Sequence, residues 1–262
     1  QPFKMSLFRN FSIGINTYGD AHKLIVKHRL WNYVLLPGLI NFLLIICIFI
    51  LGYYTGTYST NKLINWFGLS THSSDFLSLL STLISFFIRI IVYFFLFYLY
   101  FLLYKYVVLM IMSPLLAIIS EKTDEMITGN KYKFNLKKLI KDIIRGNKIV
   151  LRNLFKELLF TCLFFLLCYI PIIGIMSPCI LFVISMYYYG FSMIDYSNER
   201  MNLSVRESVQ FVSTNKGFAI ANGLIFYVLL MIPFVGLLIA PSYSVIAATI
   251  GVRKISRNEN NF

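Results

Sequence analysis

The chain has 262 residues, of which 58% are hydrophobic, 17% aromatic and only 13% charged. Because soluble domains carry roughly a quarter of charged residues, this composition excludes an ordinary soluble protein and predicts an all-α integral membrane protein with several spans. The formal net charge is +13. An excess of Lys and Arg is typical of cytoplasmic loops, and the sequence contains no nucleic-acid-binding motif, so we expect no nucleic-acid partner.

The N-terminal part predicts an amphipathic segment followed by a first membrane span. Residues 3–30 place apolar and basic side chains on opposite sides at helical spacing, which indicates an interfacial amphipathic helix. Residues 34–54 carry no charge and suffice to cross a bilayer, with Pro37 tolerated in the first turn. The polar residues that follow predict an extracytoplasmic loop.

A second, much longer helix is expected over residues 76–120. At about 1.5 Å per residue it exceeds the thickness of one bilayer. Arg89 and Lys105 interrupt the apolar run, and their long side chains suit the two surfaces of a span that lies between them. Pro114 is expected to kink the inner extension.

Residues 135–156 predict a basic amphipathic helix. Apolar side chains mark one face and Lys and Arg cover the other, with a break expected at Gly146. Such a helix suits an anionic cytoplasmic leaflet, and the positive charge places both termini in the cytoplasm. Because abundant Ile, Lys, Asn, Phe and Tyr are typical of an AT-rich genome, we expect the bacterial inner membrane.

Two near copies of an Ile-Pro-x-x-Gly segment lie at residues 170–174 and 232–236, each within an uncharged apolar run. Pro and Gly break helices, so Pro171, Gly174, Pro233 and Gly236 predict the tips of two hairpins, residues 158–194 and 218–252. The arms are short for full spans and return to the same side, which favours re-entrant, hemi-penetrating hairpins. Repeated broken segments of this kind indicate a transport pathway. Residues 195–216 predict a polar connection between the hairpins.

No catalytic constellation is evident, so we expect no enzyme, no cofactor and no metal site. The four cysteines lie in apolar runs without metal-ligand spacing. Glu121 and Glu125 share a helical face, which is more typical of a solvated surface than of an acid/base pair. Guanidinium groups suit oxyanions, so Arg29 and Arg89 are anion-binding candidates, whereas snorkelling to the membrane surface is the alternative for each.

An ordered set of short motifs resembles the CysZ sulfate permeases, a family that also includes eukaryotic etoposide-induced endoplasmic-reticulum proteins. Residues 31–42, WNYVLLPGLINF, resemble the segment that opens the first span of those permeases. The two Ile-Pro tips and the closing Ala-Ala-Thr at residues 247–249 also resemble the family. Further matching positions are Pro37, Pro114, Glu121, Glu125, Gly129, Asp195 and Tyr196. Each motif is weak alone, but the set extends in order over residues 11–252.

The resemblance implies two long transmembrane helices, two hemi-penetrating hairpins, a homo-oligomer and the uptake of sulfate. The family's sulfate-contacting segment, Gly-Leu-Arg followed by a further Arg, falls on residues 29–32, where this chain reads Arg-Leu-Trp-Asn. Only Leu30 is kept. Either Arg29 substitutes from a neighbouring position, or this member does not bind sulfate there.

Two functions follow from the sequence, and a weaker third is a lipid-handling role. The first is an anion permease or channel with sulfate as its substrate and Arg29, Leu30 and Arg89 as binding candidates. The alternative is a non-transporting scaffold, an accessory subunit of a larger membrane complex. We treat residues 1–262 as a single membrane domain in contact with lipid.

Overall fold

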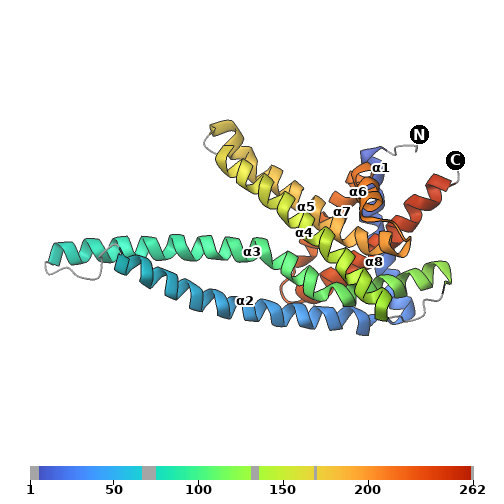
Figure 1. Cartoon of the computed structure of the whole chain (residues 1–262), viewed down its shortest axis with the longest axis horizontal. Helices are drawn as coiled ribbons and strands as arrows, with labels where there is room; N and C mark the ends of the chain where they lie inside the picture. Colours follow the sequence, from blue (N-terminus) through green and yellow to red (C-terminus); the bar gives the residue numbers. More distant parts are fainter. Residues whose placement is uncertain (1–5, 67–74, 131–135, 168–169, 261–262) are drawn as a thin grey trace. The chain divides into compact units, whose positions relative to one another are not determined.

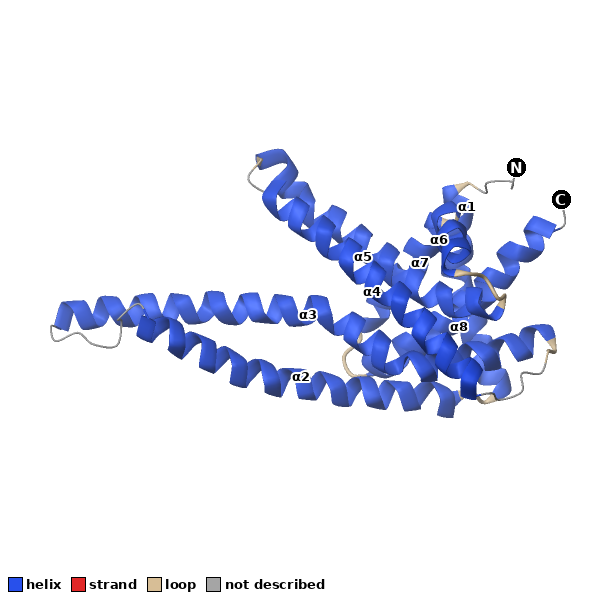
Figure 2. Ribbon diagram, in the orientation of Figure 1, coloured by secondary structure: helices blue, strands red, loops and turns tan. Residues whose placement is uncertain are grey.

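The computed structural model describes residues 6–66, 75–130, 136–167 and 170–260. All regular elements in these ranges are helices, and no strand occurs there (Figure 2). The predicted all-helical class is therefore confirmed. The helices are α1 (Leu7–His28), α2 (Trp31–Trp66), α3 (Asp75–Thr128), α4 (Leu136–Leu167), α5 (Pro171–Arg200), α6 (Val205–Thr214), α7 (Lys216–Leu230) and α8 (Val235–Asn260).

The chain divides into two compact units. Unit 2 comprises Leu43–Val108 and pairs the C-terminal part of α2 with the N-terminal part of α3 (Figure 1). A Cβ on Gly56 would lie 2.3 Å from the Tyr93 ring, so the glycine lets α2 approach that ring. Unit 1 comprises Gln1–Phe42 and Leu109–Phe262 and holds the remaining helices.

Within the described residues, four segments are long and apolar enough to cross a membrane: Trp31–Trp66, Lys105–Thr128, Ile172–Arg200 and Leu238–Arg257. Large apolar side chains on them face outward, and Phe49 and Leu51, for example, are 63% and 57% exposed. Monomeric soluble proteins rarely expose apolar surface on this scale, whereas lipid covers it without cost. The chain is therefore a membrane protein, as the composition predicts.

The core of unit 1 depends on a close approach between α5 and α7. A Cβ on Gly190 would lie 1.9 Å from the Ala219 carbonyl oxygen, and a Cβ on Gly223 would lie 2.0 Å from that of Met186. Glycine is required at both positions, which is typical of helix interfaces in membranes. The Tyr189 ring also stacks on Phe226, with centroids 3.6 Å apart.

The amphipathic N-terminal segment is helix α1, and its buried face packs on α7 and α8. The Tyr18 hydroxyl donates to the carbonyl oxygen of Asn222 at 2.8 Å, and burial raises the pKa of Tyr18 well above its usual value. The Ser244 hydroxyl donates to the Asn222 side-chain oxygen at 2.7 Å. These bonds satisfy polar groups that would be costly to bury alone.

Several helices run through positions where the sequence predicts a break or an end. The expected interruption at Gly146 is wrong, because α4 continues from the basic segment into the first hairpin arm (Figure 1). Gly146 is buried in that helix, with Ser113 Oγ 3.7 Å from the position of a Cβ. Helix α2 extends to Trp66, into the predicted extracytoplasmic loop. Helix α3 continues through Pro114, where the sequence predicts a kink, and Pro37 lies in the second turn of α2 rather than in the first, because α2 begins at Trp31.

Helix α5 extends to Arg200, so the first residues of the predicted polar connection are helical and buried. The physical reason is that their charged side chains find partners on neighbouring helices. The hairpin arms correspond to the helix pairs α4–α5 and α7–α8, each of which is in contact. Their depth in a membrane stays a prediction.

Candidate functional site

The two Ile-Pro-x-x-Gly segments form tips with the same backbone hydrogen bond. The Gly174 amide donates to the Ile170 carbonyl at 2.7 Å, and the Gly236 amide donates to the Ile232 carbonyl at 2.9 Å. Pro171 is the first residue of α5, where its missing N–H costs nothing. Pro233 lies just before α8. The two tips therefore share this hydrogen bond, but Pro171 opens a helical turn, whereas Phe234 has a positive φ of 58° just before α8.

Apolar side chains cover both tips. Ile172 and Ile175 are 76% and 81% exposed at the first tip, and Met231 and Phe234 are 75% and 69% exposed at the second. Gly236 is packed so closely that a Cβ would lie 2.0 Å from the Leu229 carbonyl oxygen. The tips thus offer backbone turns and apolar surface, but no charged group to hold an ion.

Arg29 lies at the junction between α1 and α2. It caps α1 in a left-handed backbone conformation, with φ 53° and ψ 43°, and its side chain is exposed. In the described part of the chain no carboxylate pairs with it. Leu30 beside it is buried, and its amide donates to the Ile25 carbonyl at 3.0 Å. The buried leucine fixes the turn, and the arginine side chain remains available to bind a ligand.

The N-terminus of α2 adds backbone donors to this junction. The first amides of a helix have no partner within it, and the described residues offer no backbone acceptor to those of Trp31 and Asn32. Unpaired amides and the helix dipole together attract anions. Lys122 of α3 lies within electrostatic range of Tyr33 in the first turn of α2, but its charge is paired with Glu125 at 2.7 Å and adds none to the junction. The junction is therefore electropositive and open to solvent.

Residues of the segment 31–42 and of α8 hold the helix that starts at this junction. Pro37 and Gly38 are both buried in α2. A Cβ on Gly38 would lie 1.9 Å from the Leu238 carbonyl oxygen, so α2 and α8 are in backbone contact there. The Ser242 hydroxyl of α8 also donates to the Val34 carbonyl at 3.1 Å. These contacts position the α2 N-terminus on the core of unit 1.

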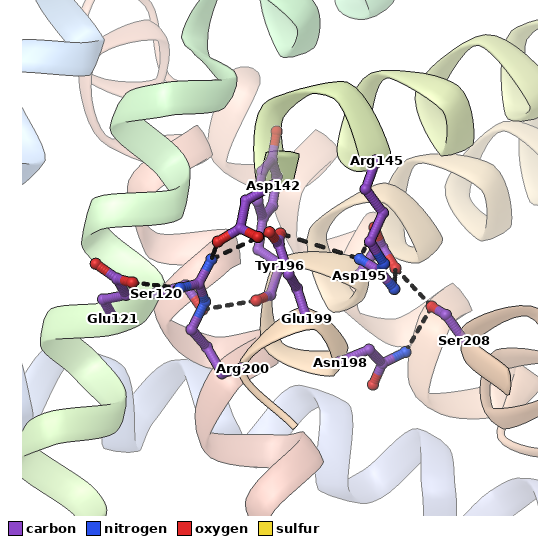
Figure 3. Close-up of polar contacts among 10 residues, drawn as sticks. All are labelled: Ser120, Glu121, Asp142, Arg145, Asp195, Tyr196, Asn198, Glu199, Arg200 and Ser208. Atoms are coloured by element: carbon purple, nitrogen blue, oxygen red, sulfur yellow. Dashed lines mark hydrogen bonds and ion pairs between the residues drawn. The ribbon is translucent and has the colours of Figure 1, made fainter. Parts of the chain in front are cut away.

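A second polar group lies at the C-terminal end of α5, where Arg200 is buried with a side chain only 1% exposed (Figure 3). Its guanidinium binds Glu121 of α3 and contacts Asp142 of α4 at 3.1 Å and Glu199 at 3.3 Å. One arginine thus joins three helices. Because a buried charge without a partner is very costly, the buried guanidinium needs these carboxylates, and Glu199, with a side chain only 4% exposed, needs the guanidinium most.

Arg145 of α4 and Asp195 of α5 form the other half of this cluster (Figure 3). Two parallel hydrogen bonds of 3.0 Å link the guanidinium to the carboxylate. The Ser208 hydroxyl of α6 donates to the same carboxylate at 2.6 Å, and Asn198 donates to Ser208 at 2.9 Å. The bidentate pair and the serine leave Asp195 fully engaged.

Glu199 lies between the two arginines. Its carboxylate oxygens are 3.3 Å from Arg200 Nη2 and 4.0 Å from Arg145 Nη1, and neither contact has hydrogen-bond geometry. Four carboxylates therefore surround two guanidinium groups. Because carboxylates outnumber the guanidinium groups, both arginines are already paired, and neither can serve an anion.

The remaining family-motif residues belong to the same part of unit 1. Glu125 pairs with Lys122 at 2.7 Å, and Gly129 follows the end of α3 with φ 77°, a conformation that favours glycine. Tyr196 is buried, and its carbonyl accepts from the Ser120 hydroxyl at 3.2 Å. Asp124 is paired with Arg253 of α8 at 2.5 and 2.7 Å. These residues join α3 to α5 and α8.

Arg89, the third anion-binding candidate, lies on α3 in unit 2 and is exposed. Its role in anion binding stays a prediction. Among the described residues, no group of three or more His, Cys, Asp or Glu side chains is arranged to hold a metal ion.

Sequence reasoning missed the central position of Asp142, Glu199 and Arg200. Asp195, Glu199 and Arg200 follow an apolar run at helical spacing, which is a signal for a charged turn that continues a buried helix. Arg145 was expected at the leaflet, but it is committed to Asp195 instead.

A family model described as sulfate transporter CysZ/etoposide-induced protein 2.4 matches residues 18–241. No curated protein matches the chain. The matched residues include the α1–α2 junction, both tips and the cluster around Arg200, and they cover well over half of the sequence.

Proposed function

The chain belongs to the sulfate transporter CysZ/etoposide-induced protein 2.4 family, and from that premise we propose that it is a membrane permease or channel for an inorganic anion, with sulfate as its substrate. The observation that carries this proposal is the α1–α2 junction. There an exposed arginine without a described carboxylate partner lies next to the free amides of a helix N-terminus. This combination suits a tetrahedral oxyanion.

Arg29 would supply the charge that the residues at positions 31 and 32 lack. A guanidinium can donate two parallel bonds to an oxyanion, and the α2 amides can donate from the other side. The indole and amide side chains of Trp31 and Asn32 are also exposed at this turn. Substitution from the neighbouring position is thus the alternative that we adopt for the altered segment.

The cluster around Arg200 would serve as the anchor of the pathway rather than as its binding site. Its arginines are held by carboxylates, and an added anion would meet an excess of negative charge. The cluster links α3, α4 and α5 at one point. We propose that it fixes the base of the first hairpin while the tips reach into the bilayer as re-entrant segments.

The exposed apolar tips fit that placement. The backbone groups of a re-entrant tip must be satisfied by protein or by water, whereas apolar side chains such as Ile175 and Phe234 suit hydrophobic surroundings. The lysines of α4 favour the cytoplasmic side of a bacterial inner membrane for this hairpin, with both termini in the cytoplasm. A homo-oligomer is part of this proposal, because the family resemblance implies it.

The same tips favour a second candidate function, a non-transporting scaffold or accessory subunit of a membrane complex. Apolar tips without a charged group could shape a wedge that binds another membrane protein. Purification in a mild detergent separates the two functions. A stoichiometric foreign partner would favour the scaffold, whereas a homo-oligomer alone would count against it.

Transport itself is tested with radiolabelled sulfate and the purified full chain in liposomes. We expect uptake above that of empty liposomes and competition by unlabelled sulfate but not by chloride at the same concentration. The matched control is the same protein denatured by heat before reconstitution. Uptake that equals the empty liposomes, with protein shown to be folded and inserted, would overturn the proposal.

A further inference from the structure

Helix α4 presents three different surfaces along its basic half, Leu136–Lys156. Projected at about 100° per residue, buried, basic and exposed apolar positions occupy three separate sectors, and within the basic sector Arg145 reaches back to Asp195 of α5. The buried sector includes Asp142, Ile149 and Asn153, and Asn153 donates to Ser192 of α5 at 3.0 Å. This sector is already covered by α5, so the other two sectors remain for contacts outside the described chain.

The basic sector contains a row of lysines. Lys141, Lys148 and Lys156 are exposed, and no described carboxylate pairs with them. At about 1.5 Å per residue the row extends over roughly 22 Å along the helix. The nearest acidic residues of α4 point elsewhere, because Asp142 binds Arg200 and Glu157 is buried. The row therefore carries uncompensated positive charge.

The exposed apolar sector lies directly beside this row. Leu136, Ile140, Ile144 and Leu151 are 60%, 49%, 54% and 40% exposed. An apolar stripe next to a basic stripe is the pattern of a helix that lies in a membrane interface, with its apolar side in the acyl region and its lysines among the headgroups. A water-soluble partner surface would not need the stripe.

The second half of α4 shows where the membrane interior begins. No Lys or Arg follows Lys156 in the helix, and Leu159, Leu163 and Leu166 are exposed there. Because α4 is continuous through Gly146, the basic half and this apolar arm belong to one helix. Lipid contact at the lysines would therefore set the angle at which the hairpin enters the bilayer.

We propose that the row of Lys141, Lys148 and Lys156, together with the apolar stripe beside it, is a binding surface for anionic phospholipid. The headgroup phosphate would contact the ammonium groups and the acyl chains would cover the stripe. This inference does not depend on sulfate transport, since it concerns a surface that is separate from the α1–α2 junction.

The experiment uses the purified full chain in nanodiscs of equal phosphatidylglycerol and phosphatidylcholine. Native mass spectrometry of the released protein gives the ratio of the two lipids that remain bound. We expect wild type to retain phosphatidylglycerol preferentially. The K141Q/K148Q/K156Q variant should lose that preference by about fivefold per lysine, the effect expected for a lysine at an anionic surface.

Two control variants make the test specific. K141R/K148R/K156R keeps the charge and should retain the wild-type ratio. K23Q/K216Q/R257Q removes three charges from exposed positions on other helices and should also retain it. The proposal would be overturned by an unchanged ratio in the Gln variant with an unchanged melting temperature, or by an equal loss in the second control.

Two further outcomes identify other occupants. Displacement of phosphatidylglycerol by an excess of inorganic phosphate would assign the row to free anions and contradict the proposal. A Gln variant that dissociates from oligomer to monomer while its lipid ratio is unchanged would assign the surface to a second copy of the chain, which also contradicts it.

Discussion

Two arginine-containing regions of unit 1, the α1–α2 junction and the C-terminal end of α5, place their arginines in opposite environments. At the junction Arg29 is exposed and has no described carboxylate partner. At the end of α5, Arg200 is buried among Glu121, Asp142 and Glu199. An arginine that already neutralises carboxylates stabilises the fold, whereas a free one can attract a ligand.

This difference separates stability from function in a testable way. Removing an arginine from the buried cluster leaves carboxylates uncompensated in a medium of low polarity. Removing Arg29 leaves no buried charge behind. Variants of the cluster should therefore change the melting temperature, and variants of Arg29 should change sulfate uptake. A variant that changes both would contradict this separation.

The largest effect is expected for Arg200→Gln. Loss of one partner of a buried ion pair costs about 3–5 kcal/mol, because the remaining charges stay buried. The variant should elute as aggregate in size-exclusion chromatography, or unfold at a clearly lower temperature than wild type in the same detergent. Arg257→Gln, on an exposed position of α8, is the control. A wild-type melting temperature for Arg200→Gln would contradict the cluster's structural role.

A smaller effect is expected for Arg145→Lys. Lysine keeps the charge but cannot reproduce the two parallel bonds to Asp195, and a hydrogen bond to a charged group contributes about 1.5–3 kcal/mol. The melting temperature should fall, but less than in Arg200→Gln. Lys148→Arg on the exposed side of the same helix should leave it unchanged. An equal fall in melting temperature in both variants would show that α4 tolerates no change at either position. The fall in Arg145→Lys could then not be assigned to its bonds with Asp195.

The smallest effect concerns Glu207 in the capping box that starts α6. Two groups of Ser204 hold the pKa of the Glu207 carboxylate below its usual value. The hydroxyl has the larger effect, and the backbone amide, which donates to the carboxylate at 2.7 Å, has the smaller one. A lowered pKa in the folded state means that the carboxylate stabilises above its ordinary pKa and loses this contribution as pH falls through the lowered value.

We therefore expect Glu207→Ala to melt below wild type at pH 7, and the gap to narrow towards pH 4. Differential scanning fluorimetry of both proteins over this range measures the gap, and other carboxylates cancel in the difference. A gap that widens in acid would contradict the sign of this effect.

The sequence predicts much of the fold, because long apolar runs and paired helix breakers dictate helices and hairpin tips locally. The two Ile-Pro-x-x-Gly tips and the amphipathic α1 are examples. The cluster at the end of α5 could not be predicted in the same way. Its contacts join residues far apart in sequence, such as Arg145 with Asp195, and a charged turn looks like a surface connection until its partners are known.

The residues of the candidate site could be predicted from the sequence more easily than the packing around them. Arg29 and Leu30 were identified from their position before the first span, and the structure adds that one is exposed and the other buried. The backbone contact between Gly38 and Leu238 was not foreseeable, since it depends on how α8 packs on α2.

The central claim is that the free arginine at the α1–α2 junction contacts the transported anion. Its most direct test is the concentration dependence of sulfate uptake by liposomes that contain wild type, Arg29→Ala or Arg29→Lys, with Lys23→Gln as control. Loss of a charge-assisted hydrogen bond should raise the half-saturating concentration of Arg29→Ala by about tenfold or more, with an unchanged melting temperature. Arg29→Lys should lie between. Wild-type uptake by Arg29→Ala at every sulfate concentration would contradict the account.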